Sequence, residues 1–259
     1  MMREQGASVA AYVDALELPP VYESLGADPD AALGPKFVDA PQAVAVGAQL
    51  AEFTAKVPPD LRAAISDSML LAQLAANKAS EKPGASADVF AWYDKYIEVL
   101  KGIGWTVVDF EQQAQSVSTL NAGVHSAIIP VVTAMLGPTM AAASMVLSVL
   151  NGLKEMDQSS KWITLFDRAS QHAHGAKFQV SHVDVPDGGD PTIQVACFTI
   201  DAKREVTQVL FAKFSENSAD LRKAVGSFAA GRDRILASNG LINDRVKPFI
   251  ADYVSGIEI

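Results

Sequence analysis

The chain has 259 residues, of which 49% are hydrophobic and 20% are charged, and its formal net charge is −9. This composition excludes an intrinsically disordered chain, because disorder requires low hydrophobicity together with a high net charge. The acidic balance, without a cluster of Lys and Arg, argues against nucleic-acid binding. It also argues against electrostatic attachment to anionic membranes but leaves apolar insertion open.

The first residues lack the apolar run and the small-residue cleavage site of a secretory signal. We therefore expect synthesis in the cytoplasm, and we leave open signal-independent export or membrane association. Cys197 is the only cysteine. An internal disulfide and a thiolate zinc site are thus excluded, and any role for Cys197 is that of a lone thiol.

The first two-thirds of the chain predicts mainly helices, from the helical spacing of apolar residues and from Pro, Gly and Asp at the boundaries. One short strand is expected at residues 105–110, after the glycines at 102 and 104. The predicted helices are 8–18, one beginning at Ala40-Pro41 with Asp39 as its cap, 58–78, 89–100 with Ser86 or Asp88 as its cap, and 160–172.

An uncharged segment extends from Gln112 to Leu153, without a single Asp, Glu, Lys or Arg. It predicts two apolar helices joined at Gly137-Pro138. Each half is shorter than the roughly 20 residues that span a bilayer, so neither is a conventional transmembrane helix. Three interpretations remain: a helix pair buried in the core, one wall of a lipid or acyl-chain pocket, and a membrane-inserting hairpin at residues 126–153.

The C-terminal third predicts three strands, at residues 177–185, 192–201 and 206–214, with a turn at 186–191. Short connections between them indicate an antiparallel meander. A terminal helix is expected to begin near Asn243 or Asp244, with Pro248 acceptable only in its first turn. The predicted fold is therefore α+β in a single domain over residues 1–259, helical to 175, a β meander at 176–215, and a helical tail at 216–259.

Cys197 lies in a predicted strand, on the same face as Ile193 and Val195. A free cysteine is commonly an inert, buried, small hydrophobic residue. The alternative is a thiol that opens into an apolar pocket built with the uncharged helices and carries a thioester-linked fatty acyl chain. Each methylene buried there would contribute about 0.8 kcal/mol. The predicted pocket walls are Ile128, Ile129, Val132, Met135, Met145, Leu147 and Val195.

His182 lies in the strand that precedes the strand of Cys197, so the two side chains could form a nucleophile and base pair. Such a pair would predict a cysteine-dependent acyltransferase or thioesterase. A metal site is not expected, because the four histidines lack the spacing of metal ligands. Nucleotide binding is not expected either, because neither GxGxxG nor GxxxxGK[ST] occurs.

A helical protein with a long uncharged helix pair, a three-stranded meander and a sole cysteine in Gln194-Val195-Ala196-Cys197-Phe198 resembles the Evf virulence factors of plant-pathogenic enterobacteria. The resemblance covers most of the chain in layout and matches no diagnostic motif. It implies an α/β fold with a palmitoyl group linked through a thioester to a buried cysteine, here Cys197, and a role in bacterial persistence or toxicity.

Three functions are therefore expected, in this order. The first is a fatty-acyl or lipid-binding, virulence-type protein without a cofactor other than an acyl group on Cys197. The second is a toxin-like protein that inserts the hairpin 126–153 into membranes. The third is the cysteine-dependent enzyme, with Cys197 as nucleophile and His182 as base.

Overall fold

The computed structural model describes residues 2–21, 34–80, 89–113, 123–172, 175–201, 208–212 and 220–257. The fold is α+β, as predicted. Its helices are α1 (Met2–Ala15), α2 (Pro59–Ser80), α3 (Val89–Gly102), α4 (Val124–Ala143), α5 (Met145–Gly152), the 3₁₀ helix η1 (Leu153–Glu155), α6 (Lys161–Ser170) and α8 (Arg232–Tyr253). Its strands are β1 (Gln42–Val46), β2 (Gln49–Phe53), β3 (Thr106–Gln113), β4 (Gln171–His172), β5 (Gly175–Asp184), β6 (Thr192–Asp201), β7 (Asp220–Ala229) and β8 (Val254–Gly256).

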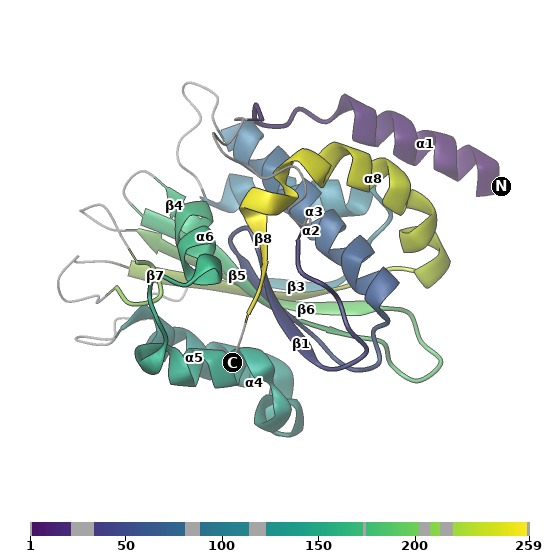
Figure 1. Cartoon of the computed structure of the whole chain (residues 1–259). Coiled ribbons are helices and arrows are strands. Elements are labelled where there is room, and N and C mark those ends of the chain that lie inside the picture. Colours follow the sequence, from purple (N-terminus) through teal and green to yellow (C-terminus); the bar gives the residue numbers. More distant parts are fainter. Residues whose placement is uncertain are drawn as a thin grey trace.

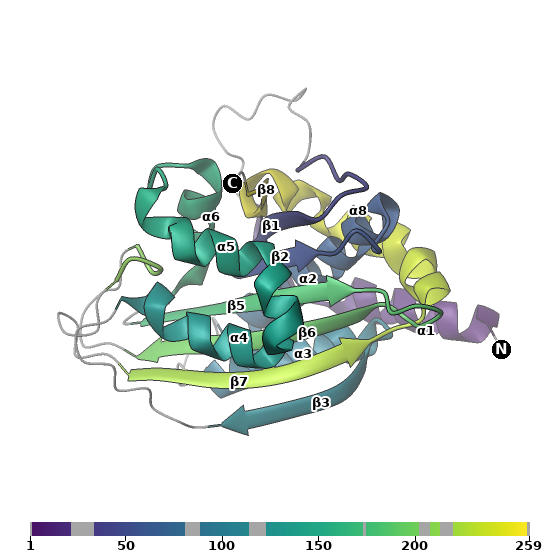
Figure 2. The same ribbon diagram turned by 90° about the horizontal axis from the view of Figure 1, so that it is seen from below.

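One mixed sheet forms the middle layer of the molecule, with strand order β3-β7-β6-β5-β2-β1-β8 and with β4 paired to β5. All pairs are antiparallel except β2 with β5, which is parallel. Helices α1, α2, α3 and α8 cover one face of the sheet, and α4 and α5 cover the other (Figures 1 and 2). Because side chains of a strand alternate between faces, strands β1, β2, β5, β6 and β7 each contribute to two separate cores.

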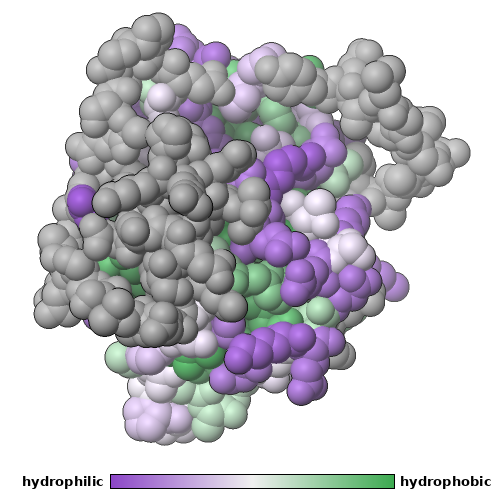
Figure 3. All heavy atoms as spheres, turned by 90° about the vertical axis from the view of Figure 1, so that its left-hand side faces the viewer, coloured by the Kyte–Doolittle hydropathy of each residue, from purple (hydrophilic) through white to green (hydrophobic). Residues whose placement is uncertain are grey.

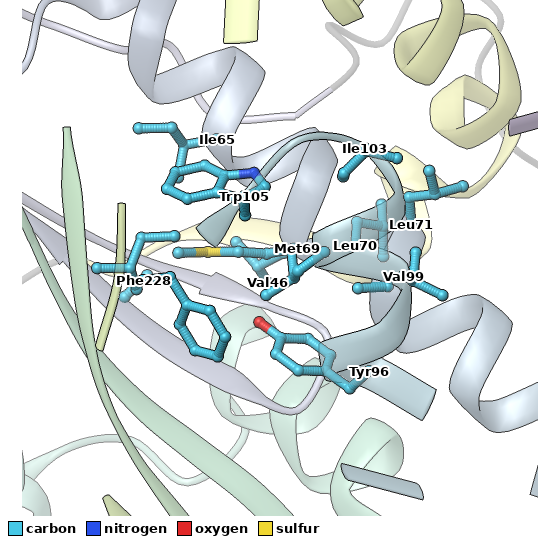
Figure 4. Close-up of a cluster of buried hydrophobic side chains, with 14 of the residues drawn as sticks. Val46, Ile65, Met69, Leu70, Leu71, Tyr96, Val99, Ile103, Trp105 and Phe228 are labelled. Atoms are coloured by element: carbon cyan, nitrogen blue, oxygen red, sulfur yellow. The ribbon is translucent and has the colours of Figure 1, made fainter. Parts of the chain in front are cut away.

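The first core lies between the sheet and α2, α3 and α8, with Met69, Leu70, Tyr96 and Val99 packed near Phe228 of β7 (Figure 4). Trp92 and Tyr96 stack with ring centroids 5.5 Å apart. The second core lies on the opposite face, where apolar residues of α4, α5 and α6 pack on alternate residues of β1, β2, β5 and β6. The central strands of the sheet therefore separate the two cores from each other.

The β1–β2 hairpin replaces the helix that we predicted from Ala40. Val46 pairs with Gln49 across a turn in which Gly47 has a φ of 54°, a conformation that favours glycine. The helix prediction is wrong because the alternation of Ala and Val around a central glycine is the two-residue period of a strand. That period determines the structure here, and the helix-start signals, Asp39 as a cap and a proline at 41, do not. Glu52 is consequently a strand residue.

Arg62 in α2 is completely buried and fastens this hairpin to the helix layer. Its Nε donates to the carbonyl of Val57 at 2.6 Å, Nη1 to that of Ala40 at 2.6 Å, and Nη2 to that of Thr54 at 2.8 Å. Its guanidinium also lies 5.9 Å from the ring centre of Phe53. One side chain thus donates to three backbone carbonyls, of which that of Thr54 also accepts a hydrogen bond from the amide of Val57 at 3.1 Å.

Most of the other predicted elements are confirmed, among them the helices at 59–80, 89–102 and 161–170 and the strands at 106–113, 175–184 and 192–201. Two predictions near the C-terminus are wrong. The described part of the predicted strand 206–214, residues 208–212, forms turns, and the third meander strand is β7. Helix α8 begins at Arg232 and not near Asn243, and it contains Pro248 well inside its length. The predicted caps Ser86 and Asp88 lie outside the described residues.

Candidate functional site

Cys197 lies in the middle of β6, on the face covered by α2 and α3, and is buried. Tyr93, Phe110, Thr199 and Ala224 are among its neighbours around a cavity of about 10 Å³. Burial raises the pKa of the thiol well above its usual value, so the sulfur carries its proton at neutral pH. This environment is that of an inert core thiol, and the space beside it is far smaller than a hydrocarbon chain.

His182 lies on the opposite face of the sheet from Cys197. In the β5–β6 register Cys197 pairs with Gln179 and His182 pairs with Gln194. His182 shares its face with Phe178 and Val180 of the second core, whereas Cys197 belongs to the first. The predicted nucleophile and base pair is therefore not formed, because the two residues have opposite parity along strands whose side chains alternate.

The residues predicted to form the acyl pocket are likewise divided between the two faces of the sheet. Its walls from α4 and α5 all lie over the second face, and only Val195 lies on the face of Cys197. The walls in question are Ile128, Ile129, Val132, Met135, Met145 and Leu147. The thiol and the uncharged helices are thus on two sides of one sheet, and the prediction that together they form one pocket is wrong.

Helices α4 and α5, hereafter the α4–α5 unit (residues 124–152), form the most unusual surface of the described chain. The unit contains no Asp, Glu, Lys or Arg. Helix α4 is the one helix of the described residues that is long and apolar enough to cross a membrane, with a mean hydropathy of 1.6, yet only 28% of that stretch is buried. Its solvent-facing positions are occupied by Ser126, Pro130, Thr133, Ala134, Pro138, Thr139, Met140, Ala142 and Ala143.

This finding corrects the interpretation of the segment as a fully buried helix pair. The α4–α5 unit lies across one side of the molecule as an outer layer (Figure 2). In Figure 3 the lower end of the molecule, where the unit lies in Figure 1, is coloured pale to green below a band of strongly hydrophilic side chains. A surface helix of a soluble protein ordinarily has charged residues on its outer side. This helix has none.

The unit is interrupted twice. Gly137, with a φ of 73° and a ψ of 165°, breaks the helical geometry of α4 next to Pro138, as the sequence predicted. Ser144 then separates α4 from α5, and its hydroxyl caps α5 by accepting a hydrogen bond from the amide of Leu147 at 3.2 Å. The predicted second helix is consequently split between the end of α4 and α5.

A buried carboxylate fastens the junction of α4 and α5 to the sheet. Glu52 of β2, 4% exposed, accepts hydrogen bonds at Oε2 from the Ser144 hydroxyl at 2.7 Å and from the Val146 amide at 2.9 Å. Its Oε1 accepts a hydrogen bond from Nδ1 of His182, its register partner in β5, which is 8% exposed. The negative charge also lies at the positive end of α5.

The charge on Glu52 is maintained by these donors. Burial alone would raise the pKa of the carboxyl, but the hydrogen bonds from His182, Val146 and Ser144 outweigh it and hold the pKa below its usual value. Sequence reasoning missed Glu52 because it was placed in a helix. The signal was available in the strand-like period of residues 42–53, which puts Glu52 on the face of Leu50.

The start of the α4–α5 unit is held by backbone hydrogen bonds to the segment 208–212. The amide of Val124 donates to the carbonyl of Ala212 at 2.9 Å, and the amide of His125 donates to that of Leu210 at 3.2 Å. Nδ1 of His125 also lies 3.0 Å from the Leu210 oxygen. Within the described residues, the unit therefore has one polar attachment at its first turn and another at Glu52.

A groove of about 320 Å³ runs between α4 and β7, lined mainly by apolar side chains, with Met135 on one side and Lys223 on the other. Met135 is the only predicted wall residue that lines it. No cluster of three or more His, Cys, Asp or Glu that could hold a metal ion occurs among the described residues.

No protein-family model matches the chain, and no curated protein matches it either. Solved structures resemble it at low similarity. A delta-endotoxin is 14% identical with a TM-score of 0.41, over 83% of this chain and 91% of that one. The activated Cyt2Ba monomer from Bacillus thuringiensis subsp. israelensis is 15% identical with a TM-score of 0.38, over 70% and 96%. The Evf virulence factor is 14% identical with a TM-score of 0.33, over 97% and 91%.

The Evf virulence factor, to which the sequence predicted a resemblance, is thus among the similar structures, together with a delta-endotoxin and Cyt2Ba. The identities and TM-scores place the chain in none of these families.

Proposed function

We propose that this protein is a membrane-active, toxin-like protein that detaches the α4–α5 unit from its sheet and inserts it into a lipid bilayer. The observation that carries the proposal is the uncharged outer side of α4. A helix that remained on the surface would gain solubility from charged residues there, at little cost to its packing. The absence of charged residues is explained if the outer side of α4 later contacts the hydrocarbon of a membrane.

The energetics of insertion support this proposal. Helices satisfy their own backbone hydrogen bonds, which a bilayer requires, and Leu, Ile, Phe and Val each favour the membrane centre by roughly 0.3–0.6 kcal/mol. Asp, Lys and Arg would each oppose insertion by about 2.5–3.5 kcal/mol, and the unit contains none of them. Gly137 and Pro138 are compatible with a membrane helix, since neighbouring helices can satisfy the freed backbone groups.

The partner in this proposal is the hydrocarbon layer of a membrane, and the protein would associate with membranes after its synthesis. A fatty-acyl chain on Cys197 forms no part of it, because the thiol lies on the other face of the sheet beside a cavity of about 10 Å³. A net charge of −9 also makes neutral lipids a better target than anionic lipids.

Leakage from vesicles tests the proposal. We expect the protein to release an entrapped dye from phosphatidylcholine vesicles, with little change when the salt concentration is raised, because apolar contacts drive insertion. The release should be measured from mildly alkaline to strongly acidic pH. Intact vesicles at every pH and at high protein-to-lipid ratios would contradict the proposal.

A further inference from the structure

The strongest unexplained feature of the molecule is the buried carboxylate under the junction of α4 and α5. Three donors from two separate parts of the chain converge on Glu52: Ser144 and Val146 from the α4–α5 unit, and His182 from the sheet. A buried ionised carboxylate is costly unless its hydrogen bonds are satisfied. An apolar residue would join the two layers without that cost, so a charge here needs a reason.

We propose that the Glu52–His182 pair is an acid-sensitive latch that holds the α4–α5 unit on the sheet until Glu52 takes up a proton. This inference rests on the proposed insertion of that unit and names how it is regulated. With Glu52 ionised, the carboxylate binds the N-terminus of α5 and accepts a hydrogen bond from His182. With Glu52 neutral, both interactions weaken, because the carboxyl has lost the charge that strengthened them.

Few other titratable groups face this pair. Neither α5 nor β1 contains an acidic or a basic residue, and the one titratable residue of α4 is His125, in its first turn. Two residues beyond His182 on the same face of β5, Asp184 accepts a hydrogen bond from the Thr54 hydroxyl at 2.6 Å. At this junction acid therefore acts through Glu52, whose carboxylate accepts all three hydrogen bonds.

The direction of the pH effect follows from the lowered pKa of Glu52. A carboxyl whose pKa is depressed in the folded state stabilises that state above its unfolded pKa, and the stabilisation is lost as the pH falls through the folded value. The latch therefore stays closed at neutral pH and opens only in acid, below the ordinary pKa of Glu of about 4.3.

The test compares dye release from phosphatidylcholine vesicles as a function of pH for the wild type, Glu52→Gln and the control Glu98→Gln. Glu98 is an exposed residue of α3 that pairs with Lys95 at 2.8 Å, outside the α4–α5 unit. We expect wild type and Glu98→Gln to leak mainly in acid. Glu52→Gln should leak at neutral pH at least about tenfold faster than wild type, the factor that corresponds to loss of a hydrogen bond to a charged group.

Cys197 reports whether the rest of the fold survives in the variant. It is buried on the opposite face, so a thiol reagent should not reach it when only the α4–α5 unit is released. If Glu52→Gln makes Cys197 reactive, Ser144→Ala decides the question, because it keeps both titratable groups and removes one donor to Glu52. Its leakage should then begin at a higher pH than that of the wild type.

Each outcome separates the two proposals. Leakage that is equal at all pH values, or a wild-type pH profile in both Glu52→Gln and Ser144→Ala, overturns the latch and leaves membrane insertion standing. An absence of leakage in every variant at every pH overturns membrane insertion, and the latch with it.

Discussion

Thr133→Lys should lower vesicle leakage by about a hundredfold while the protein remains folded. Thr133 lies on the exposed side of α4, so an ammonium group there stays in water in the folded protein and changes stability little. On insertion the same group, which keeps its charge in acid, would enter hydrocarbon at a cost of about 2.5–3.5 kcal/mol near the bilayer centre. Dye release at the optimal pH of the wild type measures the effect.

Thr164→Lys is the matched control for this substitution. Thr164 is also an exposed helix residue, in α6, and both threonine hydroxyls donate to the carbonyl four residues before them, at 2.8 Å for Thr133 and 3.1 Å for Thr164. The control should therefore leak like the wild type. Equal leakage by both variants would mean that α4 does not enter the membrane.

Arg62→Met should lower the free energy of unfolding by about 3 kcal/mol or more, the largest stability effect that we expect from one substitution. The change removes three hydrogen bonds from a charged group, each contributing about 1.5–3 kcal/mol, and leaves the carbonyl of the buried Val57 without its side-chain donor. Urea denaturation followed by circular dichroism measures the difference.

The control for Arg62 is Arg232→Met. Arg232 is exposed and lies 3.9 Å from Asp60, a surface pair that contributes about 1 kcal/mol at most. Its substitution should change the free energy of unfolding by less than half as much as Arg62→Met. Similar losses in the two variants would show that the three buried hydrogen bonds contribute little.

Local patterns predicted the helices and strands well where one period was clear. The uncharged helices, the break at Gly137 and the strand of Cys197 are in the structure because they depend on hydrophobic spacing and on Gly or Pro nearby. The β1–β2 hairpin was missed because two short strands of Ala and Val around a glycine compete with a helix start signal. Strand β7 was missed because the apolar run at residues 206–214, which comes before it in the sequence, also has the pattern of a strand.

The candidate site was less predictable because it depends on which sheet face each side chain occupies. The sequence placed Cys197 and His182 on neighbouring strands, but only the register of β5 with β6 shows that they lie on opposite faces. Similarly, no local pattern pairs Glu52 with Ser144, which lies 92 residues away. Contacts across layers are set by the tertiary fold, so sequence periodicity alone does not contain them.

The most direct test of membrane insertion is the environment of residue 133 during leakage. An environment-sensitive fluorophore attached to Thr133→Cys labels that position selectively, because Cys197 is buried. The account predicts a blue shift of its emission when phosphatidylcholine vesicles leak, and no shift for the same label at Thr164→Cys. Leakage with an unchanged emission at residue 133 would contradict insertion of the α4–α5 unit.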